Sequence, residues 1–305
     1  MSLEKLIEQR IERLESVPDK LQTVIDKNDE LLFKQILKDL DSLELEDGKI
    51  KASKNNLARI NGILENMKQV LFGSDYLDAI KEFAGEISTQ AALNNNIMEQ
   101  TVGSFSDDDI FKATLQSSQK NALLLMDENA VAHNFLQPLS EILTNSIVSN
   151  VSYQQAVATL RENMVGENAL LSKYAGTIIK DTFAISDRQY NELISKKHGI
   201  EFYRYDGSRV KGSRYFCCVR KGNIYHRKEI ESWGDKPSLW DNPKNGGKCE
   251  NAHGGGRNPD TNSATIFSYL GGYGCIDILV PIATEYVPVA DKQRAIELGY
   301  YKEAA

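Results

Sequence analysis

Tryptophan and cysteine are absent from residues 1–198, and glycine and proline are scarce there, with 7 of the 21 glycines and 2 of the 7 prolines. Because glycine and proline interrupt helices, their scarcity predicts long helices in this segment. No uninterrupted apolar run exceeds Ala122–Met126, whereas a bilayer-spanning helix needs about 20 such residues. The beginning of the chain also lacks the apolar stretch of a secretory signal. We therefore expect no membrane span and a protein that folds where it is synthesised.

Cysteine is too sparse for a disulfide framework, since the 305 residues contain four. Without a secretory signal thiols normally stay reduced, so we expect free cysteines. Cys249 and His253 have the spacing of a zinc half-site. The residues that could complete it are Cys217, Cys218, His226 and Cys275. No C-x2-C pair exists, and neighbouring cysteines on a strand point to opposite faces. We therefore predict packed thiols, no metal ligand and no cofactor, with zinc binding as the alternative.

Catalytic motifs are missing as well. Residues 253–256, HGGG, resemble the oxyanion motif of lipases, but the chain has no G-x-S-x-G nucleophile. Residues 207–213 have the glycine spacing of a phosphate-binding loop without the lysine that precedes its serine. No acid, base and nucleophile form a recognisable pattern, so we predict that the protein is not an enzyme. The enzymatic alternative is a metal-dependent nuclease or hydrolase built on His226, Cys249, His253 and Asp277.

Apolar residues recur at helical spacing throughout the first two thirds of the chain. We expect a helical arm or bundle over residues 1–130 and further helices over 131–198 that lead into the last segment. The expected helices cover residues 3–14 with an end before Pro18, 57–71, 76–99, 107–128, 131–149, a segment capped by Ser152, and 167–197. Asp107, Asp108 and Asp109 suit the N-terminus of the fourth helix.

Residues 199–305 contain both tryptophans, all four cysteines and 14 glycines. Alternating apolar residues predict strands over 200–205, 215–219, 223–225 and 276–282, with a hairpin between the second and third and a short helix over 227–233. Turn-forming residues over 234–263 predict a long irregular loop. The expected fold class is α+β: an extended multi-helix N-terminal region followed by a small mixed α+β domain with a short antiparallel sheet.

Basic residues gather in this second segment. The whole chain has a net charge of −7, whereas residues 199–257 contain 12 basic and 7 acidic residues. Tyrosines lie between the basic residues, and such a surface could bind phosphates and stack on bases. The candidate nucleic-acid contacts are Arg209, Lys211, Lys221, Arg227 and Lys228. A half-buried sheet produces the same alternation of aromatic and charged residues, so both interpretations stand.

Two segments carry a more specific pattern: SRYFCCVRKGNIYHRKEIESW at residues 213–233 and GGYGCIDILVP at residues 271–281. The residues that define it are Arg214, Phe216, Cys217, Arg220, Gly222, Trp233, Gly271, Gly272, Tyr273, Cys275 and Pro281. Together these motifs resemble the C-terminal domain of the Mu F-like head morphogenesis family, the minor head proteins of tailed bacteriophages. The resemblance covers roughly residues 140–290.

The chain departs from the family pattern at several positions. Asn223 stands where lysine is usual, Gly274 where asparagine is usual, and Ile276 and Asp277 where arginine and histidine are usual. The last change removes a histidine that could help a cysteine bind metal, which argues against a metal site. The resemblance still allows Cys217 and Cys275 to lie close together as packed thiols.

The resemblance implies a structural virion protein, a minor head component near the portal that acts in head assembly or genome delivery. It would assemble in the host cytoplasm with portal, major capsid or neck proteins, and the helical arm would self-associate. Arg214, Arg220 and Trp233 would anchor the first motif, the two arginines by hydrogen-bonding carbonyls or carboxylates in the irregular loop. Gly271 and Gly272 would permit a tight turn. The alternative is an internal nucleic-acid-binding protein ejected with the genome.

Overall fold

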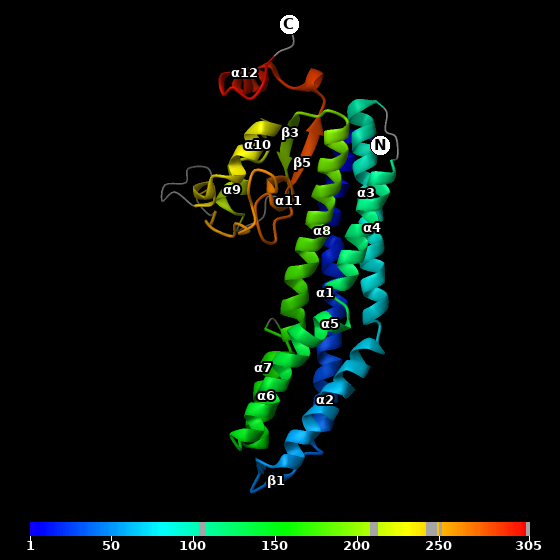
Figure 1. Ribbon diagram of the computed structural model, residues 1–305, viewed down its shortest axis with the longest axis vertical. Helices are drawn as coiled ribbons and strands as arrows, with labels where there is room; N and C mark the ends of the chain where they lie inside the picture. Colours follow the sequence, from blue (N-terminus) through cyan, green and yellow to red (C-terminus); the bar gives the residue numbers. More distant parts are fainter. Residues whose placement is uncertain (104–107, 167, 208–212, 242–248, 250–251, 303–305) are drawn as a thin grey trace. The chain divides into compact units, whose positions relative to one another are not determined.

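The computed structural model describes residues 1–103, 108–166, 168–207, 213–241, 249 and 252–302. The predicted α+β fold class is confirmed, because helices dominate and the strands form two small antiparallel sheets (Figure 1). The chain forms two compact units. Unit 1 comprises Met1–Ser16, Glu86–Gln119 and Lys180–Ala305, and unit 2 comprises Val17–Gly85 and Lys120–Ile179. The predicted domains are continuous stretches of sequence with boundaries at residues 130 and 198. Each compact unit instead combines segments from separate parts of the chain.

The helices of the described chain lie mostly where apolar periodicity predicts them. Their bounds are α1 Leu3–Leu40, α2 Lys54–Phe72, α3 Tyr76–Val102, α4 Asp109–Leu124, α5 Glu128–Val131, α6 Gln137–Val148, α7 Tyr153–Met164, α8 Leu170–Lys197, α9 Tyr215–Cys218, α10 Arg227–Gly234, α11 Ile266–Tyr269 and α12 Val289–Glu297. A π-helical turn, Ala132–Leu136, joins α5 to α6, and a 3-10 turn covers Pro237–Trp240. The strands are β1 Leu45–Glu46, β2 Lys49–Ile50, β3 Phe202–Asp206, β4 Ile224–His226 and β5 Ile278–Ile282.

One predicted helix end is wrong. The first helix does not stop before Pro18 but continues to Leu40. Proline inside a helix removes one backbone hydrogen bond and costs about 3 kcal/mol. The apolar face around it continues without a break through Val17, Leu21 and Ile25, each buried, and burial of one such side chain contributes about 1.5–3 kcal/mol. Packing therefore outweighs the local cost of the proline.

Unit 2 is organised by helix caps and buried apolar faces. The side chain of Ser53 caps α2 by accepting a hydrogen bond from the Asn56 amide, 3.2 Å away. Ser152 caps α7 as predicted, and Gln155 completes a capping box by accepting from the Ser152 amide. A buried tyrosine, Tyr76, donates from its hydroxyl to the Met126 carbonyl at 3.2 Å. These contacts satisfy polar groups that the helix ends would otherwise leave without partners.

The helical part of unit 1 is held by a buried polar network. Arg10 on α1 donates three hydrogen bonds to the Asp187 carboxylate on α8, and neither side chain is exposed to solvent. Gln90 and Asn94 on α3 donate to the same carboxylate at 3.0 and 2.9 Å. Burying an unpaired charge is strongly unfavourable, so the network specifies how these three helix segments align.

The three-stranded sheet of unit 1 has the order β4-β3-β5, with both pairs antiparallel. In Figure 1 the strands β3 and β5 are drawn between the helices α8 and α10. Tyr203 and Tyr205 on β3 belong to a core that includes residues of α8, α10 and α11, whereas Phe202 packs with Val287 and Ala295 near the C-terminus. The alternation of side chains along a strand explains this division between the two faces.

A second prediction is wrong in this region. Residues 215–219 were expected to form a strand and a hairpin with 223–225, but Tyr215–Cys218 is a helical turn, α9. The partner of β4 is β3, with Tyr203 opposite Tyr225. The helical turn inserts Phe216 and Cys217 into the core. Their burial accounts for the apolar pattern that predicts a strand here. Short apolar runs cannot be assigned by periodicity alone.

Candidate functional site: a buried cysteine and carboxylate cluster

Two cysteines and one aspartate from distant parts of the sequence meet inside unit 1. The sulfur atoms of Cys217, on α9, and Cys275, in the turn before β5, lie 4.0 Å apart. The Cys275 sulfur lies 3.8 Å from Asp277 Oδ2. All three residues are at least nine-tenths buried, and their ligand atoms lie within 4.8 Å of one another. We call this set the Cys217–Cys275–Asp277 cluster. The sequence interpretation of closely packed thiols holds for Cys217 and Cys275.

Glycines let the backbone approach this cluster closely. A Cβ on Gly271 would lie 2.4 Å from the Cys217 sulfur and 2.8 Å from the Cys275 sulfur. A Cβ on Gly207 would lie 2.1 Å from Asp277 Oδ1. Gly272 has a φ of +94°, and its Cβ would lie 1.9 Å from the Gly256 carbonyl oxygen. The tight turn predicted at Gly271 and Gly272 therefore has a steric basis, because any side chain at these positions would displace backbone or sulfur atoms.

Charged and polar side chains fix the carboxylate of Asp277. Lys221 Nζ lies 2.9 Å from Asp277 Oδ1, and both side chains are almost fully buried. The Tyr205 hydroxyl donates to Asp277 Oδ2 at 3.3 Å. Arg188 on α8 donates to the backbone carbonyls of Asp277 and Cys275. The two carboxylate oxygens thus have different surroundings: Oδ1 faces the lysine, and Oδ2 faces the tyrosine and Cys275.

The two thiols differ in acidity. The pKa of Cys275 is lowered to about 7, because the Cys217 thiol donates a hydrogen bond to it and because the Arg188 guanidinium is close. The same hydrogen bond and burial raise the pKa of Cys217. Burial also raises the pKa of Tyr205.

Arg214 joins the two sequence motifs. Its guanidinium donates to the Gly271 carbonyl at 3.3 Å and to the Tyr273 carbonyl. The Tyr273 ring is 46% exposed, so its backbone rather than its side chain takes part in this junction. Arg214 bonds to carbonyls as expected, but these carbonyls lie in the turn before β5 and not in the irregular loop over 234–263.

The other motif residues form the aromatic core beside the cluster. Arg220 lies over the rings of Phe216 and Trp233, with its guanidinium carbon 3.8 and 4.5 Å from the ring centroids. Trp240 stacks on Phe216 at 4.1 Å and donates from its indole nitrogen to the Gly271 carbonyl. Two further motif residues shape the backbone: Gly222 has a φ of +83°, and Pro281 lies opposite Tyr203 in the sheet.

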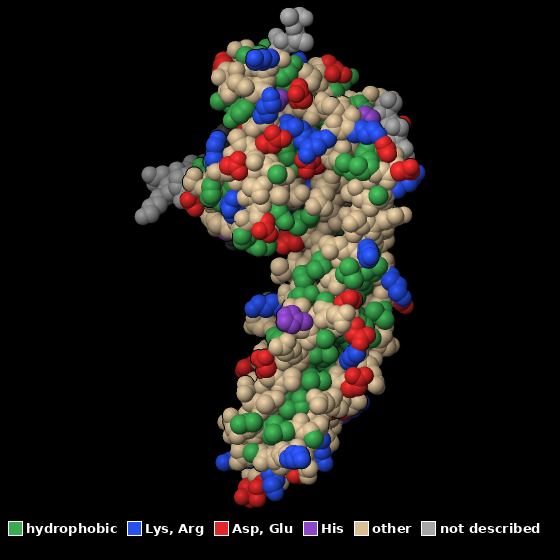
Figure 2. All heavy atoms as spheres, viewed as in Figure 1, with side chains coloured by type: hydrophobic (Ala, Val, Ile, Leu, Met, Phe, Trp, Pro, Cys, Tyr) green, Lys and Arg blue, Asp and Glu red, His purple; other side chains and the backbone are tan. Residues whose placement is uncertain are grey.

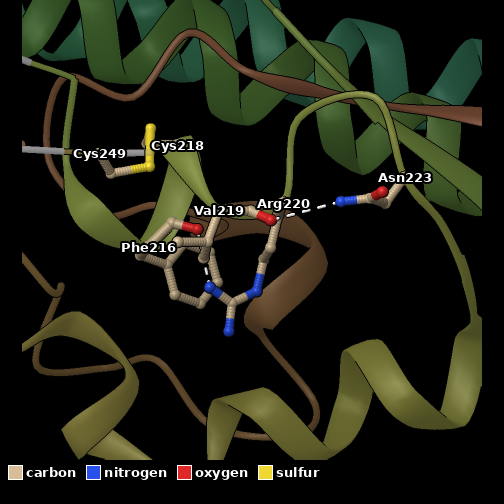
Figure 3. The surroundings of a disulfide bond; sticks show 6 residues. All are labelled: Phe216, Cys218, Val219, Arg220, Asn223 and Cys249. Carbon is tan, nitrogen blue, oxygen red and sulfur yellow. Dashed lines mark hydrogen bonds between the residues drawn. A yellow bond between two sulfur atoms is a disulfide. The ribbon is translucent and has the colours of Figure 1, made fainter. Parts of the chain in front are cut away.

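The expectation that all four cysteines are free is wrong. Cys218 and Cys249 form a disulfide, which leaves Cys217 and Cys275 as the free thiols (Figure 3). The figure shows the disulfide near Arg220, whose guanidinium nitrogen donates to the Phe216 carbonyl at 2.7 Å. On the helical turn α9, Cys217 points into the core while Cys218 reaches Cys249. The disulfide removes Cys249 from the proposed zinc half-site.

The histidines of that half-site do not join the cluster. His226 caps α10, its Nδ1 accepts from the Lys228 amide at 3.1 Å, and burial lowers its pKa. His253 is exposed, and its backbone forms an isolated bridge with Arg214. Within the described part of the chain, the group of cysteine, histidine and acidic side chains close enough to share a metal ion is Cys217, Cys275 and Asp277.

The candidate nucleic-acid contacts do not form one described surface. Arg209 and Lys211 lie outside the described residues. The side chain of Lys221 is buried against Asp277. Arg227 bonds to the Tyr203 hydroxyl and lies over the Phe267 ring, 4.7 Å from its centroid. Lys228 is exposed. Two of the five predicted contacts therefore act inside the protein.

Two parts of the site carried no recognisable signal in the sequence. Arg188 lies in the middle of a long helix, and nothing in its spacing indicates that it reaches carbonyls about 90 residues later. Trp240 lies in the segment that was expected to be irregular. Asp277 departs from the family pattern and belongs to the alternative metal-dependent site, but nothing in the sequence predicts its contact with Cys275.

Comparison of the chain with protein families, with curated proteins and with solved structures gives no match. Among the described helices, none has the length and apolar content to span a bilayer.

Proposed function

We propose that this protein is a structural component of a tailed-phage virion, a minor head protein near the portal, and that it is not an enzyme. The observation that carries this proposal is the meeting of the two quoted motifs in one junction. Arg214, in the first motif, bonds to the carbonyls of Gly271 and Tyr273 in the second, 57 and 59 residues later. The motif residues bond to backbone and pack against one another, which supports a structural role for them.

The surface of unit 2 is consistent with docking to other proteins. Several large apolar side chains of this unit are exposed: Leu31, Leu45, Leu57, Leu77, Leu123, Leu124 and Val148. Figure 2 shows hydrophobic side chains between charged ones over one face. Portal, capsid or neck proteins, or a second copy of the chain, are the proposed partners, since assembly interfaces are built around apolar residues.

The proposal is tested by locating the chain in particles of the phage that encodes it. Quantitative mass spectrometry would compare intact particles with particles emptied of DNA. A low, fixed copy number in both preparations is the expected result. Loss of the chain together with the genome would support the alternative, an internal protein that contacts nucleic acid and is ejected. Absence from both preparations would overturn the virion role.

A further inference from the structure

The Cys217–Cys275–Asp277 cluster has dimensions close to those of a tetrahedral zinc site. With Zn–S bonds of about 2.3 Å and Zn–O bonds of about 2.0 Å, two sulfur ligands lie about 3.8 Å apart, and a sulfur and an oxygen about 3.5 Å apart. The corresponding distances here are 4.0 and 3.8 Å. The third pair, the Cys217 sulfur and the Asp277 carboxylate oxygen, lies within 4.8 Å, so these two atoms approach each other by up to roughly 1.3 Å when they surround an ion. We propose that Cys217, Cys275 and Asp277 bind a zinc ion.

The surroundings of the three ligands favour this use. Metal-binding carboxylates are usually oriented by a hydrogen bond to their other oxygen, and Lys221 binds Asp277 Oδ1 and leaves Oδ2 facing Cys275. Arg188 holds the carbonyl of Cys275, which fixes the backbone that carries the second thiol.

Charge balance is compatible with a divalent ion in this buried place. A zinc ion that displaces the protons of both thiols leaves the net charge of the cluster unchanged, because two positive charges replace two protons. Two thiolates with one carboxylate form a soft ligand set that suits zinc better than magnesium or calcium, which prefer oxygen ligands. The other two cysteines are joined in a disulfide and do not compete for the ion.

The site is tested on the full-length chain, purified with a non-thiol reductant, exposed to zinc sulfate and freed of excess metal. Elemental analysis is expected to find about one zinc ion per chain. The Cys217→Ser/Cys275→Ser double variant is expected to lose that ion. Cys218→Ser/Cys249→Ser is the matched control: it removes the other two cysteines, whether joined or reduced, but leaves the cluster intact, so it is expected to keep the zinc.

Because the double variant could unfold, a second measurement uses the wild-type chain alone. Cobalt(II) added to the metal-free protein should produce the absorption of tetrahedral cobalt and a thiolate-to-cobalt charge-transfer band. Absence of both zinc and cobalt binding in the reduced wild-type chain would overturn the proposal. Retention of zinc by a double variant that circular dichroism shows to be folded would overturn it as well. These results do not depend on the virion role, which the particle analysis tests separately.

Discussion

At the scale of single residues, the backbone conformation and close contacts of two glycines in unit 1 determine which substitutions they tolerate. Gly272 and Gly274 both have a positive φ, of +94° and +63°. A Cβ on Gly272 would overlap the Gly256 carbonyl oxygen, whereas a Cβ on Gly274 would meet no atom within 4 Å. The pair therefore separates the cost of the backbone conformation from the cost of the steric overlap.

We expect Gly272→Ala to lower the free energy of unfolding by about 3 kcal/mol and Gly274→Ala by about 1 kcal/mol. The positive φ alone costs about 1–2 kcal/mol for a residue with a side chain, and overpacking adds about 1–3 kcal/mol. Urea unfolding of the full-length variants measures both values. Equal losses for the two variants would contradict the close approach of Gly272 to Gly256.

A shared hydroxyl in unit 2 makes one carboxyl sensitive to pH. Ser172 Oγ lies 2.6 Å from Asp26 Oδ1 and also within hydrogen-bond distance of Asp29 Oδ2. A hydroxyl donates one proton, so one of the two carboxyl groups must supply the second. Burial raises the pKa of Asp29 from 3.8 to about 7. Asp29 is therefore the carboxyl that holds the extra proton.

This arrangement predicts that the protein loses stability as the pH rises from about 4 to about 7. In that window the folded state keeps a proton on Asp29 that the unfolded state has lost, and ionisation above the folded pKa leaves a buried charge. Asp29→Asn should remove a difference on the order of 2–4 kcal/mol between pH 5 and pH 8. Chemical denaturation at both values measures it. Glu30→Gln, at an exposed neighbouring position, should keep the wild-type profile.

At the scale of elements, caps and buried faces decide where helices begin and end. The capping box of α7 satisfies amides at its N-terminus with two side chains of the same turn, Ser152 and Gln155. We expect Ser152→Ala to destabilise unit 2 by about 1 kcal/mol, because the Gln155 amide loses its acceptor. Thermal unfolding measures the loss. Gln154→Ala, at an exposed position of the same helix, should cause almost none.

Comparison of the observed with the predicted helices shows how much of the fold can be predicted from the sequence. The 3.6-residue period locates α2, α3, α7 and α8 within a few residues. It fails at Pro18, because distant packing offsets a local cost, and at α9, because a single helical turn is too short to show a period. The chemistry of the site is only partly predictable: Gly271, Gly272, Cys217 and Cys275 belong to sequence motifs, whereas no local pattern indicates Arg188 or the Cys218–Cys249 pairing.

At the scale of the whole molecule, the composition change near residue 199 does not mark a compact unit. Unit 1 combines the segment after this position with parts of α1, α3, α4 and α8. Its core includes Tyr190 and Ile194 of α8 together with Tyr203 and Phe216. The strands and the cluster therefore depend on helical residues that come earlier in the chain.

A fragment of residues 199–305 is accordingly expected not to fold alone. It lacks Arg188, which bonds to the carbonyls of Ser268, Cys275 and Asp277, and Asn191, which donates to the Leu279 carbonyl. The near-ultraviolet circular dichroism of the fragment should show little of the fixed aromatic signal of the full chain. A fragment with a cooperative unfolding transition would contradict this dependence on α8.

The discontinuity of unit 1 also sets an order of events on the ribosome. Arg10 leaves the ribosome before Asp187, its buried partner, which follows 177 residues later. At about 5–20 residues per second, the nascent chain waits roughly 9–35 s before this ion pair can form. Unit 1 thus completes its fold only after α8 has been synthesised, and until then the apolar face of its first helix segment remains open to chaperones or to neighbouring nascent chains.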